Sequence, residues 1–219
     1  IAIVFVAFAG LLMLEPNLGT TMILAAIVLA MMLVGGVPGL PLATFGATLV
    51  GAAVAFAIAV PFRMRRLLAF MDPWADPMNA GFQTIQSQIG FATGGLLGVG
   101  LGNGRAKWGF LPEASTDFIF AIIGEETGYL GVLVVITLIL SFGLLGSRVA
   151  LRAPDRLGTL LASGITVWIL VQAFVNMGAA VGVLPITGVP LPFISAGGSS
   201  LVFTMAAVGV LLDIARRSR

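Results

Sequence analysis

The stretch that decides the fold class is residues 118–146, which read FIFAIIGEETGYLGVLVVITLILSFGLLG. Glu125 and Glu126 are its only charged residues, and a membrane-spanning helix needs about 20 predominantly apolar residues. Similar apolar runs occupy residues 1–14 (cut short), 18–37, 39–61, 157–183 and 198–215. The sequence therefore predicts an all-α fold, a polytopic bundle of transmembrane helices.

The composition of the whole chain agrees with a membrane protein and excludes several kinds of chemistry. Of its 219 residues 59% are apolar and 9% are charged, whereas about a quarter of an ordinary soluble domain is charged. Cysteine and histidine are both absent, which excludes disulfides, thiolate catalysis, and histidine-based triads or metal sites. A net charge of +2 gives no indication of nucleic-acid binding.

Residues 62–117 differ from the apolar runs, since they hold five of the eleven basic residues and four of the nine carboxylates. Long loops are usually functional or disordered, and Trp74 and Trp108 favour order at a membrane surface. We therefore expect one membrane domain over residues 1–219, with a large loop at 62–117. Because the chain opens inside an apolar run, we expect a fragment whose start lies within a membrane helix.

The positions of Lys and Arg predict the orientation, since short cytoplasmic loops carry an excess of positive charge. One group, Arg148, Arg152 and Arg156, lies in a short loop, and another, Arg216, Arg217 and Arg219, lies in the tail. We therefore expect a multi-pass protein of the cytoplasmic membrane with a cytoplasmic C-terminus and an external loop 62–117. The basic residues of that loop are Arg63, Arg65, Arg66, Arg105 and Lys107. Their external position suggests an anionic ligand.

Glu113 and Asp117 are the carboxylates best placed for acid–base chemistry. They are four residues apart and follow Pro112, so on a helix they would share one face. Asp117 stands where the polar loop meets an apolar run, and partial desolvation there can raise a carboxyl pKa toward that of a general base. The alternative is a cap of the helix that follows. We expect Glu125 and Glu126 to be buried against cations on neighbouring spans.

Two segments have a composition typical of an anion site. Arginine binds phosphate through two parallel hydrogen bonds. A diphosphate pocket is therefore predicted that combines Arg63, Arg65 and Arg66 with Arg105 and Lys107. The alternative is that the three arginines contact lipid headgroups. Glycines recur between Gly98 and Gly104 as in a phosphate cradle, although no strand precedes them. Close packing of a turn explains these glycines better.

Residues 184–200 contain three prolines and three glycines, which exclude a continuous helix. Non-helical backbone at membrane depth must be buried in protein or line a wet cavity. Without a histidine or a nearby lysine, Ser195 and Ser199 are poor nucleophiles, and we take them as candidates for binding substrate. Gln172 and Asn176 lie one turn apart and are predicted to form hydrogen bonds between helices.

Several motifs together resemble the SEDS family (shape, elongation, division and sporulation) of peptidoglycan glycosyltransferases. In chain order they are EPNLGTT (15–21), PFRMRR (61–66), FMDPWADP (70–77), GFQTIQSQIGFATGGLLGVGLGNG (81–104), KWGFLPEASTDFIFAIIGEE (107–126) and NMGAAVGVLPITGVPLPFISAGGSS (176–200). The details around Asp117 resemble division-type FtsW members more than elongation-type RodA members. Three positions depart from the family pattern: Asn17 replaces an Asp, Ser115 a His and Ala196 a Tyr.

The resemblance implies a ten-span family, of which this chain matches the C-terminal part, that polymerises lipid II into β-1,4 glycan strands at the outer face of the bacterial membrane. Asp117 matches the family's catalytic residue. Our candidates for binding substrate are Arg63, Arg65, Arg66, Arg105, Lys107, Glu113, Ser195 and Ser199. We expect no organic cofactor, and a divalent cation, Mg²⁺ or Mn²⁺, is a candidate without assigned ligands.

The partners implied by the resemblance are lipid II, the growing glycan strand, membrane lipid, a class B penicillin-binding protein and other membrane proteins of the division machinery. Three alternatives remain open at this point. The chain could be a lipid II flippase, since broken helices also mark transport sites, an elongation-type polymerase, or a scaffold without catalytic activity.

Overall fold

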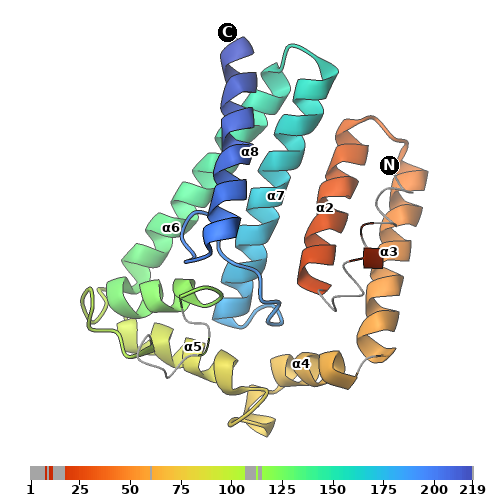
Figure 1. Cartoon of the computed structure of the whole chain (residues 1–219). Coiled ribbons are helices and arrows are strands. Elements are labelled where there is room, and N and C mark those ends of the chain that lie inside the picture. The colour runs from red at the N-terminus through yellow and green to blue at the C-terminus, as the bar shows by residue number, and fades with distance from the viewer. Residues whose placement is uncertain are drawn as a thin grey trace. The chain divides into compact units, whose positions relative to one another are not determined.

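The computed structural model describes residues 8, 10, 11, 18–59, 61–106, 112 and 115–218, without the side chains of residues 18, 57–59, 61–63 and 65. Figure 1 shows the helices in chain order: α2 (Leu18–Val34), α3 (Gly39–Ala59), α4 (Pro61–Met71), the 3₁₀ turn η1 (Pro73–Ala75), α5 (Phe82–Gly94), α6 (Ile119–Arg152), α7 (Arg156–Val181) and α8 (Gly198–Arg217). No strand occurs in this described part of the chain, and the all-α prediction is confirmed.

Four of the described helices are long and apolar enough to cross a membrane. The qualifying segments are Gly39–Phe56 in α3 and the full lengths of α6, α7 and α8, whereas α2 is apolar but shorter. Many leucines and valines on these helices are exposed, for example Leu138 (63%) and Leu144 (66%), which is the pattern of a helix that faces lipid. The predicted span at 1–14 lies almost wholly outside the described residues.

The segment 62–117, expected as a long loop, contains helical structure in its described part. Helices α4 and α5 account for much of residues 61–94, and η1 lies between them. The N-cap of η1 is Asp72, whose side chain accepts a hydrogen bond from Trp74 N. The polar residues of this segment are therefore held on short helices, which fixes the positions of their side chains better than a loop does.

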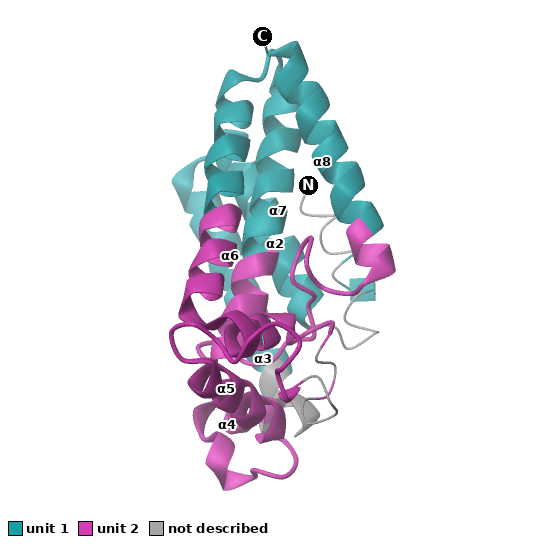
Figure 2. Ribbon diagram, turned by 90° about the vertical axis from the view of Figure 1, so that its left-hand side faces the viewer, with its two compact units in different colours: residues 1–56, 140–171, 202–219 teal, residues 57–139, 172–201 magenta. Residues whose placement is uncertain are grey.

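The chain divides into two compact units, coloured separately in Figure 2: residues 1–56, 140–171 and 202–219 form unit 1, and residues 57–139 and 172–201 form unit 2. In unit 1, a cluster of Ala150, Ala162, Leu211 and Ile214 joins the ends of α6, α7 and α8. The basic residues Arg148, Arg152, Arg156, Arg216 and Arg217 belong to these same helix ends. Positive charge therefore gathers at one end of unit 1.

In unit 2, α5 packs closely against the first turns of α6 and the end of α7. A side chain at Gly94 would overlap the carbonyl of Gly124, so glycine lets the backbones of α5 and α6 approach each other. The rings of Phe91 and Phe120 meet edge to face with centroids 5.7 Å apart. On α7 the carbonyl oxygen of Ala180 accepts a hydrogen bond from the buried Ser87 hydroxyl at 2.5 Å.

Helix α6 is interrupted at Gly128, whose φ of 67° and ψ of −164° are not helical. The interruption releases the backbone groups that would otherwise bond within the helix, and residues 95–100 take them up. Val99 N and Gly100 N donate to the carbonyls of Glu125 and Glu126 at 3.0 and 3.1 Å, while Tyr129 N donates to Gly95 O at 2.9 Å. The glycine-rich segment thus completes the hydrogen bonding of a broken membrane helix.

Substituting Gly128 by Ala should destabilise the full-length protein. A left-handed φ is costly for alanine, about 1 kcal/mol or more, and a Cβ here would lie 2.6 Å from the carbonyl of Leu96. We expect a lower melting temperature in detergent. The matched control is Gly209→Ala in α8, where a Cβ meets nothing within 4 Å and alanine is favourable in a helix. Equal melting temperatures for the two variants would contradict the strain at Gly128.

Candidate functional site

The carboxylates of Glu125 and Glu126 hold the segment that follows α5. Glu125 Oε1 and Oε2 accept hydrogen bonds from Arg105 N and Ala106 N at 2.9 and 3.0 Å. Glu126 Oε2 and Oε1 accept from Gly102 N and Gly104 N at 3.0 and 3.3 Å. These four bonds come from backbone amides, so the expectation of a cation partner on a neighbouring span is wrong for Glu125.

This arrangement also decides between the two interpretations of the glycine-rich segment. Consecutive backbone amides that point to one place make an anion site, and here the anions are two carboxylates of the same chain. Gly102 and Gly104 donate to Glu126, so their amides are not available to a phosphate. The interpretation as close packing of a turn fits the structure, and the interpretation as a phosphate cradle does not.

Asp117 lies in a turn immediately before α6, which begins at Ile119. The prediction that Asp117 and Glu113 share a helix face is therefore wrong for Asp117, and Glu113 lies outside the described residues. Phe118 and Phe120 are each only 1% exposed, and Phe118 O accepts Ala121 N at 2.9 Å. Burial of these two rings fixes where the turn ends and the helix starts, and leaves Asp117 half-buried at the boundary.

The two amide side chains of α7 hold the backbone around Asp117. Asn176 Nδ2 donates to the carbonyl oxygens of Asp117 and Val189, both at 2.7 Å. One turn earlier, Gln172 Nε2 donates to Pro190 O at 2.9 Å. Hydrogen bonds from both residues were predicted, but these partners are non-helical backbone rather than other helices. Asn176 thereby connects the Asp117 turn to the segment that follows α7.

Ser195 and Ala196 attach that segment to the residues just before Asp117. The Ser195 hydroxyl donates to Thr116 O at 2.5 Å and accepts from Leu191 N at 2.7 Å. Ala196 N donates to Ser115 O at 3.0 Å, so two of the positions that depart from the SEDS pattern contact each other. The buried Ser195 hydroxyl is thus engaged with backbone, while Ser199 is exposed in the first turn of α8.

Asp117 lines a small pocket with residues of α7 and of the segment after it. The other lining residues are Phe118, Asn176, Ala179, Ile186, Thr187, Gly188 and Val189. A Cβ built on Gly188 would lie 3.6 Å from Asp117 Oδ2, so this oxygen faces the lining segment. The carboxylate therefore lies beside a pocket whose walls are the non-helical residues 186–189.

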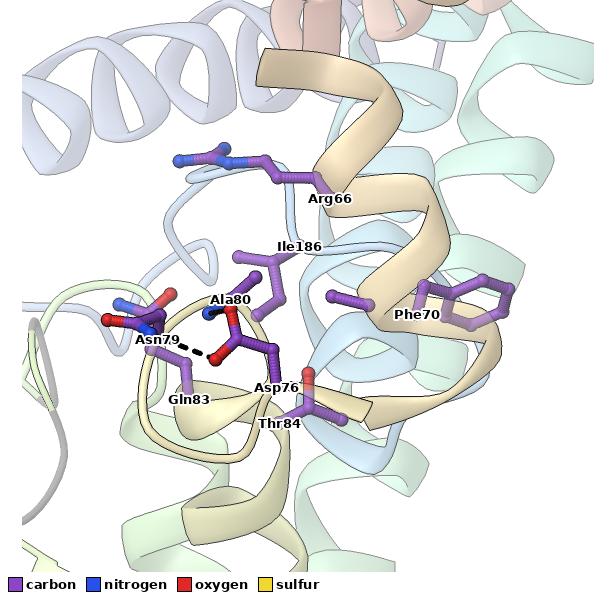
Figure 3. A pocket seen from close by; sticks show the side chains of 9 residues that line it. Arg66, Phe70, Asp76, Asn79, Ala80, Gln83, Thr84 and Ile186 are labelled. Carbon is purple, nitrogen blue, oxygen red and sulfur yellow. Dashed lines mark hydrogen bonds between the residues drawn. The ribbon is translucent and has the colours of Figure 1, made fainter. Parts of the chain in front are cut away.

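A second and larger pocket, of about 330 Å³, contains Arg66. Figure 3 shows Arg66 extending from α4, with Asp76, Asn79 and Gln83 on the facing turn and helix. Asp76 Oδ1 accepts a hydrogen bond from Asn79 Nδ2 at 2.9 Å. Ile186 lines both this pocket and the pocket of Asp117. The pocket of Arg66 and the pocket of Asp117 are therefore neighbours within unit 2.

Arg105 is separated from this pair of pockets. It lines a third pocket of about 230 Å³ with Gln86, Ile89, Gly90, Thr93, Ala106 and Glu125. The sequence predicts one anion pocket for the basic residues, and the described arginines Arg66 and Arg105 line different ones. The side chains of Arg63 and Arg65 and the whole of Lys107 lie outside the described residues.

The residues that the structure describes contain no preformed metal site of acidic side chains. No three of their acidic side chains lie close enough together to hold a metal ion. The side chains of Asn176 and Thr187, which both carry an oxygen atom, line the same pocket as Asp117. A cation bound beside Asp117 would take further oxygen ligands from a substrate phosphate.

Sequence reasoning missed several polar residues that the structure brings to the site. Asp76, Asn79 and Gln83 line the pocket of Arg66, and Thr187 lines that of Asp117. A signal for the first group exists, because Asp72-Pro73 and Asp76-Pro77 both mark turns that place polar side chains close to α4. Nothing in the sequence around Thr187 distinguishes it from other threonines of the chain.

Comparison with known proteins identifies relatives over the whole chain. A family model described as "Cell cycle protein" and named for FtsW, RodA and SpoVE matches residues 1–219. The chain is 52% identical over 160 residues to "Probable peptidoglycan glycosyltransferase FtsW" of Geobacter metallireducens, which covers 73% of the chain and 43% of that protein. It is 41% identical over 219 residues to "Stage V sporulation protein E" of Bacillus subtilis, covering 100% of the chain and 60% of that protein.

Two solved structures have the same fold. One is described as "Structural coordination of polymerization and crosslinking by a peptidoglycan synthase complex"; it has a TM-score of 0.77 and 29% identity, and the match covers 99% of this chain and 61% of that one. The other is a variant of Thermus thermophilus rod shape determining protein RodA, with a TM-score of 0.65, 29% identity, and 98% and 55% coverage. The chain thus spans about half the length of the relatives it matches.

Substituting Glu125 by Gln should destabilise the full-length protein. The carboxylate accepts two backbone hydrogen bonds, and a side-chain amide turns one acceptor into a donor that faces another donor. The expected loss is about 1–3 kcal/mol of stability, measured as a lower melting temperature in detergent. The control is Asp213→Asn, which breaks an exposed pair with Arg217 at 2.7 Å and should cost about 0–1 kcal/mol. A larger loss of stability in Asp213→Asn than in Glu125→Gln would contradict the role of Glu125 in holding the backbone of Arg105 and Ala106.

Proposed function

Since the chain belongs to the family of FtsW, RodA and SpoVE cell cycle proteins, as the SEDS motifs predicted, we propose that it carries the acid–base centre of a peptidoglycan glycosyltransferase. The relatives that bear this name are FtsW proteins. The proposed reaction polymerises lipid II into β-1,4 glycan strands during cell division. The membrane character of the chain follows from the four described helices that are long and apolar enough to cross a membrane.

One observation supports this function best: the pocket of Asp117 and the pocket of Arg66 share Ile186. A glycosyl transfer to a sugar alcohol needs a group that takes a proton and a group that stabilises a departing diphosphate. A carboxylate and a guanidinium in adjoining pockets supply these two groups. The polar side chains that line the pocket of Arg66, namely Asp76, Asn79 and Gln83, suit a sugar more than a lipid tail.

In the proposed reaction, the 4-hydroxyl oxygen of the acceptor sugar attacks the anomeric carbon of the donor. A new C–O bond forms, the bond to the undecaprenyl diphosphate breaks, and the hydroxyl proton passes to the carboxylate of Asp117. The diphosphate leaves with both bonding electrons, and Arg66 offsets the negative charge that develops. Direct attack inverts the anomeric centre, so an α-linked donor gives a β-linked product.

The remaining basic residues and a cation extend this proposal. Arg63, Arg65, Arg105 and Lys107 are candidates for contacts with other phosphate or headgroup oxygens, and Glu113 and Ser199 for sugar contacts. Mg²⁺ commonly binds substrate phosphates together with one or two carboxylates. A divalent cation would therefore bind with the diphosphate, where it would lower the charge of the leaving group.

The orientation of the protein is also a proposal. Positive charge gathers at the joined ends of α6, α7 and α8 in unit 1, which favours a cytoplasmic position for the C-terminus. The turn of Asp117 precedes α6, whose other end is Arg152, so Asp117 would lie outside if α6 crosses the membrane. There it would meet lipid II and, as in the peptidoglycan synthase complex of similar fold, a crosslinking partner. We propose that this partner is a class B penicillin-binding protein.

Substituting Asp117 by Asn in the full-length protein should abolish most glycan synthesis from lipid II. A general base contributes roughly 10²–10⁴-fold to the rate, and the amide cannot take the proton. The measurement is polymer formed by the purified protein with its partner. Asp213→Asn, which removes an exposed carboxylate of α8, is the control and should retain activity. If the Asp117→Asn variant polymerises lipid II normally, the enzyme proposal is wrong. It is also wrong if the variant and the control both move lipid II across a membrane without making glycan.

Substituting Arg66 by Gln should lower kcat/KM for lipid II. Loss of a charged hydrogen bond costs about 1.5–3 kcal/mol, which corresponds to roughly 10- to 150-fold. Arg216→Gln removes an arginine from the last turn of α8 and controls for the change in net charge. The kinetic constants of both variants are compared at one lipid II range. An Arg66→Gln enzyme indistinguishable from the control would remove Arg66 from the diphosphate site.

A further inference from the structure

Two buried oxygen atoms beside Asp117 have no hydrogen-bond partner among the residues that the structure describes. They are Asn176 Oδ1 and Thr187 Oγ1. Asn176 is only 2% exposed, and both residues line the pocket that contains Asp117. A buried polar group left without a partner costs about 1–3 kcal/mol, so two of them in one pocket point to an occupant.

The orientation of the Asn176 side chain is fixed by its other atom. Nδ2 donates to the carbonyls of Asp117 and Val189, and these two acceptors determine which end of the amide is the nitrogen. Oδ1 cannot exchange places with Nδ2 without losing both bonds. The oxygen therefore needs a donor that the described residues do not provide.

The size of the pocket limits this occupant to a single small group. The pocket leaves about 10 Å³ for the centre of a water-sized molecule, which is about what one buried water requires. A sugar ring does not fit into this space. One oxygen atom with its hydrogens does.

The number of hydrogens distinguishes a water from a sugar hydroxyl. A hydroxyl has one hydrogen, and if that hydrogen is directed to the Asp117 base, Asn176 Oδ1 remains unsatisfied. Water has two hydrogens, so it donates to Asn176 Oδ1 and to the carboxylate together and accepts from the Thr187 hydroxyl. Buried waters typically make about three such bonds.

We propose that Asn176 and Thr187 bind one ordered water molecule that bridges to Asp117, and that they position the carboxylate through it. The water donates one of its hydrogens to Oδ2, the Asp117 oxygen that faces Gly188. Asn176 and Thr187 are thus positioning residues, because they act on Asp117 and do not touch the substrate. The positioning role rests on the proposed function, whereas the water site stands independently of it.

The kinetic test uses Thr187→Val in the full-length protein with its partner and lipid II. The variant keeps the shape of the side chain and removes the hydroxyl. We expect kcat to fall roughly 5-fold, as for the loss of about 1 kcal/mol, with KM for lipid II unchanged. Thr187→Ser retains the hydroxyl and should restore kcat.

The control is Thr166→Val, because Thr166 is a buried threonine whose hydroxyl bonds only to Ala162 O of its own helix in the described contacts. A fall in kcat shared equally by Thr187→Val and Thr166→Val would overturn the positioning role. So would a rise in KM in Thr187→Val, which indicates direct contact with the substrate, or a failure of Thr187→Ser to restore the rate.

A high-resolution structure of the full-length protein without lipid II tests the water site separately from any activity. The expected result is ordered density at about 2.7–3.0 Å from Asn176 Oδ1 and Thr187 Oγ1, lost in Thr187→Val. Absence of density, density only after lipid II is added, or ligand distances of about 2.0–2.6 Å, typical of Mg²⁺ or Ca²⁺, would overturn it. If glycan synthesis fails while this density is present, only the proposed function is at fault.

Discussion

The structure depends on one constraint, which is that backbone polar groups at membrane depth must find hydrogen-bond partners inside the protein. Two long described stretches of unit 2 are not helical, residues 95–105 and residues 182–197. The first is satisfied by the backbone and carboxylates of Glu125 and Glu126. The second is satisfied by Gln172, Asn176 and Ser195. Polar residues in the apolar helices are therefore explained mainly by the loops that they hold.

The same constraint connects the fold to the proposed chemistry. Asn176 binds the carbonyl of Asp117 with one atom of its amide and lines the pocket beside the carboxylate with the rest. Ser195 fixes Thr116, the residue before Asp117. A general base must be held within hydrogen-bond reach of its proton, and a turn fixed on both sides achieves this. The residues that shape the backbone here are also the residues that position the reactive group.

Much of the fold could be predicted from the sequence, because long apolar runs bounded by Gly and Pro leave helices as the structure that satisfies the backbone in lipid. The interruption at Gly128 could not be predicted, since glycine is frequent in membrane helices. The residues whose backbone bonds to this part of α6, 95–100, also lie far away in sequence. The backbone partners of Glu125 and Glu126 were missed for a similar reason. Charge patterns reveal cations, whereas backbone amides are present at every position and become visible only in three dimensions.

The candidate site was predictable in part. Asp117 stood out because it is a carboxylate at the start of an apolar run, and the SEDS motif marks the same position. The separation of Arg66 from Arg105 was not predictable, because it depends on which part of α5 lies beside each one. Thr84 lines the pocket of Arg66, and Gly90 lines the pocket of Arg105. Thr187 gave no signal, since its importance comes only from the atoms around it.

The link between Ala196 and Ser115 has a consequence for how this site can vary. The bond joins an amide nitrogen to a carbonyl oxygen, so neither side chain takes part in it. Replacement of a bulky residue by a small one at either position leaves the two segments tied together. The backbone geometry around Asp117 can thus stay the same while the side chains at positions 115 and 196 vary among relatives.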